Sequence, residues 1–186
     1  MKIGFALCGS FCTFSKVIPV MDALSKEYEI YPIMSPVAYS TDTRFGRADE
    51  FVNTIEEICK KPVISTISAA EPIGPKKLLD ALIIAPATGN TLSKLALGIT
   101  DTSVTMAAKA HLRNSRPLII APSTNDGLFT SAKNIGLLQS MKNIYFVPYS
   151  QDDANGKPAS LVAHMDKIPE TLKLSLEGTQ IQPILA

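Results

Sequence analysis

Short apolar runs recur along the chain, and each one stops at a glycine, serine or proline before a stretch with helical spacing begins. Runs that are apolar throughout are typical of strands buried on both faces of a parallel sheet. Strands that alternate with helices predict one doubly wound α/β domain, Rossmann-like or flavodoxin-like, with helices on both faces of the sheet. The predicted strands are Lys2–Cys8, Glu29–Met34, Asp80–Ala85, Pro117–Ala121 and, as the last of the chain, Ile144–Val147.

Apolar residues at helical spacing fill the intervals between these strands. We expect a polar loop over 37–48, a short strand over 63–67, and a connection over 69–77, where two prolines and a glycine occur. No internal repeat is present, so the whole of 1–186 is expected to be a single domain. The predicted helices cover 14–24, 51–59, 90–98, 101–113, 135–141 and 161–176.

The charge balance excludes several classes of partner. Lys and Arg total 18 against 17 Asp and Glu, which gives a net charge of +1 and no reason to expect a nucleic acid or an anionic membrane. No aliphatic run approaches membrane-spanning length, and the apolar start is interpreted as a strand and not as a targeting segment. Cys8, Cys12 and Cys59 are odd in number and lack zinc-site spacing, so we expect a reduced, cytoplasmic protein without a metal site.

Glycines and small polar residues follow four of the predicted strands. In an open parallel sheet, ligands bind beyond the carboxyl ends of the strands, so these four turns are expected to form one cleft. Gly9 lets the backbone approach a ligand closely, and Ser10 stands where a helix N-terminus faces an anion. We therefore expect a phosphate-bearing ligand. The candidate binding residues are Gly9, Ser10, Phe11, Ser35, Pro86, Thr88, Gly89, Asn90, Thr91, Ser123, Thr124 and Asn125.

The same turns also have a purely structural interpretation. Gly-Ser and Pro-x-Thr-Gly-Asn are ordinary compositions of turns and helix caps, and Asn90 or Thr91 could simply cap a helix. The dinucleotide pattern G-x-G-x-x-G is absent. What favours a binding site is the coincidence of such turns at successive strand ends.

Three further side chains are candidates with open alternatives. Arg44 lies between hydroxyl residues and an aromatic one, where a guanidinium could bind a carboxylate or phosphate; the alternative is a solvated arginine paired with Asp42 or Asp49. His111 lies late in a predicted helix, which favours a surface or helix-capping role over a general base, and His164 is interpreted in the same way.

Residues 84–101, IAPATGNTLSKLALGITD, resemble the central signature of the FMN-dependent flavoproteins that include the phosphopantothenoylcysteine and lantibiotic-peptide cysteine decarboxylases. The Gly9–Ser10 turn and the turn at 122–125 fall where that family places its other flavin contacts. The resemblance implies FMN as the cofactor and a homo- or hetero-oligomer. Residues 10–19, SFCTFSKVIP, lack the catalytic histidine of the decarboxylases, and PSTN replaces their Pro-x-Met-Asn turn, which argues against decarboxylation of peptidyl cysteine.

Five other segments resemble a narrower group, the B subunits of bacterial dipicolinate synthases. This resemblance implies NADP-linked oxidation of dihydrodipicolinate to dipicolinate, the calcium chelator of endospores, together with an A subunit that brings its own nucleotide-binding domain. The segments are STDTRFG at 40–46, AEPIGP at 70–75, MAAKAHLRN at 106–114, STNDG at 123–127 and KNIYFVP at 142–148.

The implied reaction gives the candidate residues possible roles. An isoalloxazine can accept a hydride, and Arg44 is expected to face the two carboxylates of the substrate; no catalytic residue or general base is identified. One alternative is a noncatalytic partner subunit that kept a flavin fold, which the missing histidine supports. The other is a stand-alone FMN-dependent decarboxylase or prenyltransferase.

Overall fold

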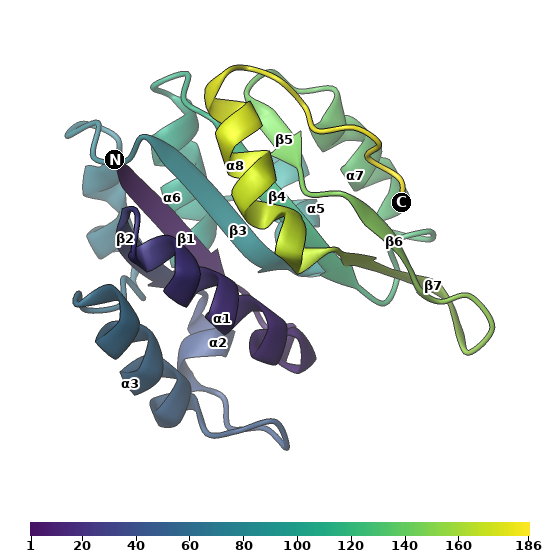
Figure 1. Ribbon diagram of the computed structural model, residues 1–186, viewed down its shortest axis with the longest axis horizontal. Coiled ribbons are helices and arrows are strands. Elements are labelled where there is room, and N and C mark those ends of the chain that lie inside the picture. Colours follow the sequence, from purple (N-terminus) through teal and green to yellow (C-terminus); the bar gives the residue numbers. More distant parts are fainter.

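Seven strands form one sheet in the computed structural model, which describes residues 1–186 (Figure 1). The strands are β1 Lys2–Leu7, β2 Glu29–Met34, β3 Ala81–Ala87, β4 Leu118–Thr124, β5 Ile144–Phe146, β6 Tyr149–Asp153 and β7 Lys157–Ala163. Their order is β2-β1-β3-β4-β7-β6, with β5 also paired to β4. The pairs among β1 to β5 are parallel, whereas β4–β7 and β6–β7 are antiparallel.

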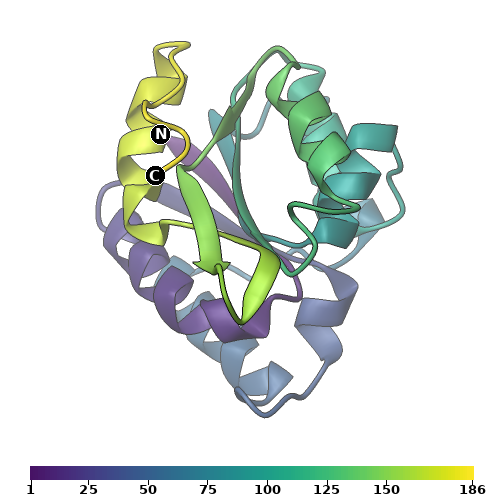
Figure 2. The same ribbon diagram turned by 90° about the vertical axis from the view of Figure 1, so that its right-hand side faces the viewer.

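Helices cover both faces of this sheet, as predicted. The main helices are α1 Phe14–Ser25, α2 Pro36–Ser40, α3 Ala48–Cys59, α4 Ile67–Ala70, α5 Gly89–Leu97, α6 Ser103–Leu112, α7 Ala132–Gln139 and α8 Ile168–Leu176, with short 3₁₀ turns η1 Phe11–Thr13, η2 Glu71–Ile73 and η3 Met165–Lys167. Figure 2 shows α1 and α8 on one side of the sheet and α5, α6 and α7 on the other. None of these helices has the length and apolar character needed to cross a membrane.

The strand order reverses between β1 and β3. The chain moves outward from β1 to β2, then crosses back to the other side of β1 to form β3 and β4. At such a reversal, the loops after the two central strands diverge to opposite faces and leave a crevice between them. Here those loops are the turn from β1 into η1 and the turn from β3 into α5, so the crevice between them is the candidate position for a ligand.

The centre of the sheet is packed on both faces. All seven residues of β3 are buried, and β4 is buried up to Ser123. Gly4 of β1 has no room for a side chain, because a Cβ atom there would lie 2.5 Å from Leu79 Cδ1 and 2.7 Å from Leu82 Cδ1. The glycine therefore allows two leucines to close over the middle of the sheet.

β4 changes its partner partway along its length. Leu118 to Ile120 pair with β5, whereas Ser123 pairs with Val162 and Thr124 with Leu161 of β7. The strand was predicted to end at Ala121, but it continues through Pro122 to Thr124. The β6–β7 hairpin is thereby attached beyond the carboxyl ends of the parallel strands.

Several predicted elements were wrong, and the reasons are local. Ile144–Val147 is not the last strand, and 161–176 is not one helix: its first three residues belong to β7 and α8 begins at Ile168. The predicted loop at 37–48 begins inside α2, because the Ser35 hydroxyl accepts the Ala38 amide hydrogen and Pro36 suits a first helical position. The expected strand at 63–67 is reduced to one bridge between Ile33 and Ile64.

The surface role predicted for His111 was wrong. The ring is 1% exposed, and Nε2 lies 3.0 Å from the Pro117 carbonyl oxygen at the start of β4. Because a carbonyl oxygen can only accept, this bond requires the proton on Nε2. His164 is not on the last helix either; it lies in the turn before η3, 3.1 Å from the Ser150 hydroxyl.

The packing at Gly4 predicts the effect of a single methyl group. We expect Gly4→Ala to lower the free energy of unfolding by about 1–3 kcal/mol, since Leu79 and Leu82 must leave their packed positions. Gly136 in α7 is the matched control, because a Cβ there meets nothing within 4 Å. Gly136→Ala is expected to stabilise by up to about 1 kcal/mol. Urea unfolding would measure both changes, and equal stability of the two variants would contradict this account.

Burial of His111 predicts a loss of stability in acid. Desolvation lowers the pKa of this ring from 6.5 to about 4 in the folded protein. Between these values the unfolded chain binds the proton more readily, so stability falls as pH drops from 6.5 to 4, by roughly 3 kcal/mol from this residue. We expect His111→Gln to flatten the pH dependence of urea unfolding in this window, with His164→Gln as the control; a variant as acid-sensitive as the wild type would refute the assignment.

Candidate functional site

A cleft of about 720 Å³ opens at the carboxyl ends of β1, β3 and β4. Its floor and walls come from the turn after β1, the turn after β3, the end of β4, the loop before α3 and the β6–β7 hairpin. A volume of this size suits a ligand as large as a nucleotide. The lining residues are Gly9 to Thr13, Lys16, Thr43, Phe45, Thr88 to Asn90, Ser123 to Asp126, Asp152, Lys157 and Ser160 to Val162.

The turn after β1 offers unpaired backbone donors. The amide hydrogens of Gly9, Phe11 and Cys12 have no acceptor within the protein, whereas the Ser10 amide donates to the Cys8 carbonyl oxygen at 2.8 Å. Clustered free amides of this kind are suited to binding an anion. Gly9 is confined, since a Cβ there would lie 3.3 Å from Val37 Cγ1.

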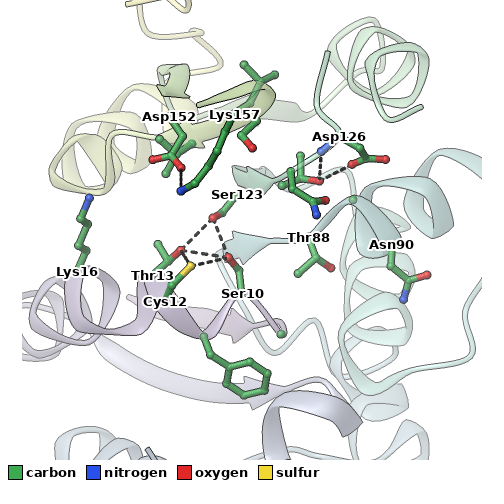
Figure 3. A pocket seen from close by; sticks show the side chains of 18 of the residues that line it. Ser10, Cys12, Thr13, Lys16, Thr88, Asn90, Ser123, Asp126, Asp152 and Lys157 are labelled. Atoms are coloured by element: carbon green, nitrogen blue, oxygen red, sulfur yellow. Dashed lines mark hydrogen bonds and ion pairs between the residues drawn. The ribbon is translucent and has the colours of Figure 1, made fainter. Parts of the chain in front are cut away.

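Three hydroxyl groups meet at the floor of the cleft (Figure 3). The Ser10 and Thr13 hydroxyls are 3.1 Å apart, and each lies 2.9 Å from the Ser123 hydroxyl. This hydroxyl cluster joins the turn after β1 to the end of β4. Each hydroxyl can both donate and accept, so the cluster can turn donors toward an anionic ligand without leaving a group unpaired.

The N-terminus of α5 forms the next wall. The Thr88 hydroxyl accepts the Thr91 amide hydrogen at 3.3 Å and so caps the helix. Gly89 has no room for a side chain, because a Cβ atom would lie 2.6 Å from the Asp126 carboxylate. That carboxylate accepts hydrogen bonds from the Thr124 and Ser131 hydroxyls at 2.5 and 2.9 Å. Asp126 therefore offsets the partial positive charge that this helix end would present to a ligand.

The β6–β7 hairpin closes the cleft on the opposite side. Lys157 donates a hydrogen bond to Asp152 at 2.7 Å, and this pairing raises the pKa of the lysine. Lys16, from α1, also lines the cleft and has no carboxylate within 4.0 Å. These two lysines are the cations of the cleft, and Asp126 and Asp152 are its anions.

The cysteines differ in their surroundings. Cys12 is exposed in the cleft, with its sulfur 3.9 Å from the Ser10 hydroxyl and 3.8 Å from the Thr13 hydroxyl. Cys8 is buried, and desolvation raises the pKa of its thiol to about 11, so it stays protonated at neutral pH. No group of three or more histidine, cysteine, aspartate or glutamate side chains is arranged to hold a metal ion.

The structure brings most of the predicted site residues together. Those that line the cleft are Gly9, Ser10, Phe11, Thr88, Gly89, Asn90, Ser123, Thr124 and Asn125. Ser35, Pro86 and Thr91 lie outside the lining: Ser35 caps α2, and the Thr91 hydroxyl donates to the buried Cys8 sulfur at 3.2 Å. Whether the lining residues bind a cofactor stays a prediction.

Arg44 lies at the edge of the cleft. Its neighbours Thr43 and Phe45 belong to the lining, whereas the Arg44 guanidinium lies over the Phe45 ring, 4.9 Å from the ring centre. The alternative pairing with Asp49 is not formed, because that carboxylate binds Arg47 at 2.7 Å. The substrate-binding role of Arg44 stays a prediction.

Sequence reasoning missed the hairpin and both lysines. The signal for the hairpin was the Asn155–Gly156 pair, which is typical of tight turns between antiparallel strands. Both of these amides donate to the Asp153 carboxylate, at 3.1 and 2.9 Å, and hold the turn. No comparable signal marked Lys16, because its position on the cleft-facing side of α1 depends on how that helix packs.

Known proteins resemble this chain over most of its length. The model of the family described as Flavoprotein matches residues 1–173. The B subunit of dipicolinate synthase from Bacillus subtilis (strain 168) is 47% identical over 185 residues, which cover 99% of this chain and 92% of that protein. The coenzyme A biosynthesis bifunctional protein CoaBC of Methanocaldococcus jannaschii is 32% identical over 107 residues, covering 55% of this chain and 26% of that protein.

Solved structures agree with these sequence matches. The crystal structure of the dipicolinate synthase B subunit from Bacillus halodurans C superimposes with a TM-score of 0.91 at 44% identity, covering 100% of this chain and 95% of the other. The FMN-dependent cysteine decarboxylase SpaF superimposes with a TM-score of 0.66 at 24% identity, covering 94% and 97%, and shows a shared fold. The chain therefore belongs to the flavoprotein family, in which it groups with the dipicolinate synthase B subunits.

Proposed function

We propose that this chain is the B subunit of a dipicolinate synthase and acts in the cytoplasm of sporulating cells with an A subunit that binds NADP. In this proposal the pair oxidises dihydrodipicolinate to dipicolinate, and the cleft of this chain holds FMN. The observation that carries the proposal is the cleft itself, with free amides and hydroxyls at the strand reversal of a chain related over its whole length to B subunits.

The cleft residues fit the polar parts of FMN. The free amides of Gly9, Phe11 and Cys12 and the Ser10 hydroxyl are donors suited to a phosphate group. The N-terminus of α5 suits a phosphate less well, because the Asp126 carboxylate lies beside Gly89 in its first turn and would repel a second anion. Thr88, Asn90 and Asn125 provide further hydrogen-bonding groups for the uncharged part of the molecule.

The chain's own residues have defined roles in this scheme. Bound FMN would supply a hydride acceptor for the oxidation. The amides of the first turn and the hydroxyl cluster would fix the ligand against the carboxyl ends of β1 and β4. The apolar side chains of Phe45, Leu161 and Val162 would exclude water from part of the cleft.

A second candidate function is a noncatalytic partner that organises the A subunit. It is favoured by one observation: no histidine lines the cleft. His111 lies at the start of β4, and His164 is bonded to Ser150 on the hairpin side. The same observation disfavours a stand-alone decarboxylase of the histidine-dependent kind.

FMN uptake tests the cofactor. We expect FMN to bind more tightly than riboflavin by roughly tenfold or more, since riboflavin lacks the phosphate that the free amides would bind. Ser10→Ala is expected to weaken FMN binding, whereas Ser68→Ala removes an exposed hydroxyl outside the cleft and should change nothing. Quenching of flavin fluorescence during titration measures all of these affinities. A chain that binds neither flavin would exclude FMN from the proposal.

Mixing the subunits tests the activity. We expect turnover of dihydrodipicolinate, followed by NADPH formation, to require this chain together with an A subunit. Each subunit alone is the control. If the A subunit alone were fully active, the catalytic role would fall to it and the noncatalytic alternative would stand.

A further inference from the structure

The two lysines of the cleft lie at one end of it. In Figure 3, Lys16 stands to the left of the hydroxyl cluster and the Lys157 ammonium lies above it beside Asp152, whereas Thr88, Asn90 and Asp126 lie to the right. Lys16 rises from α1, and Lys157 comes from β7 of the hairpin, so two separate elements bring the positive charge to the same end. The free amides of the first turn are a different set of donors.

The ion pair between Lys157 and Asp152 on the hairpin can exchange its carboxylate for one from a ligand. Lys157 and Asp152 are 61% and 40% exposed, and such solvent-exposed pairs contribute little to stability. The Lys157 ammonium nevertheless lies at the cleft, beside Asp152 and above the hydroxyl cluster (Figure 3). A carboxylate from solution could therefore replace Asp152 at small cost.

We propose that Lys16 and Lys157 bind the two carboxylates of a small dianionic substrate. In the absence of substrate, Asp152 stays bound to the Lys157 ammonium, and the substrate displaces it. The assignment of the dianion as a substrate rests on the proposed function. Charge-assisted hydrogen bonds between ammonium and carboxylate are the strongest polar contacts that this cleft can offer. Two cations from different walls would also favour a dianion over a monoanion, which can engage only one of them.

The phosphate of a flavin is the competing occupant of these lysines. The free amides of Gly9, Phe11 and Cys12 give that phosphate a separate site, and they carry no competing carboxylate. The lysine end has the opposite character, since Asp152 is already bound there and mimics a carboxylate ligand. The chemistry of each end therefore matches a different anion.

Calorimetric titration with pyridine-2,6-dicarboxylate tests the proposal on the full chain, in metal-free buffer, with and without FMN. We expect Lys16→Gln and Lys157→Gln each to weaken binding by roughly tenfold. Asp152→Asn should tighten binding severalfold, because it removes the internal competitor. Lys142→Gln is the matched control, since this exposed lysine lies before β5 and does not line the cleft. Urea unfolding would show that each variant remains folded.

Four results would overturn the proposal. The first is that the wild type fails to bind the dianion with or without FMN, and the second is that both lysine variants bind it with wild-type affinity. The third is that only Arg44→Ala lowers the affinity for the dianion. The fourth is that the lysine variants lose FMN uptake but still bind the dianion. Weaker binding by Asp152→Asn would overturn the competitor role. Because dianion binding needs no turnover, an inactive mixture with the A subunit would sink the proposed function and leave this result standing.

Discussion

The change of partner along β4 determines the architecture of the cleft. The first half of the strand extends the parallel sheet to β5, and the second half pairs in the antiparallel direction with β7. Backbone groups at the end of β4 would otherwise face the cleft unpaired, and their pairing with Leu161 and Val162 satisfies them. The hairpin is thereby fixed beside the strand reversal, where it adds a further wall to the crevice between the two turns.

Sequence patterns predicted the parallel part of the fold because burial leaves a strong signal there. β1, β3 and β4 are apolar on both faces, so short apolar runs that stop at glycine, serine or proline indicated strands and not helices. The hairpin left a weak signal, since most of β6 is exposed and polar, and the apolar residues of β7 run directly toward α8. Its pairing depends on contacts with β4, which are distant in sequence and invisible to local periodicity.

The candidate site was predictable to the extent that it consists of turns. Glycines and hydroxyl residues after β1, β3 and β4 marked the cleft, because the topology gathers those ends at one edge. Ser35 and Thr91 have the same composition but turn inward, one to cap α2 and the other toward Cys8. Local sequence cannot separate these two outcomes, since a hydroxyl that caps a helix and one that meets a ligand occupy similar turns.

The net charge of the chain could not predict where an anion would bind in the cleft, because positive and negative side chains lie at different places along its lining. Lys16 and Lys157 are balanced by Asp126 and Asp152, so the lining is neutral overall. The balance is uneven in space: Asp126 offsets the end of α5, Asp152 offsets Lys157, and Lys16 and the first-turn amides remain uncompensated. An anion gains most from Lys16 and the first-turn amides, which no carboxylate offsets, and it gains Lys157 only by replacing the exposed Asp152. Specificity then follows from which internal carboxylate a ligand can replace, and Asp126, held by two hydroxyls, is the harder one to replace.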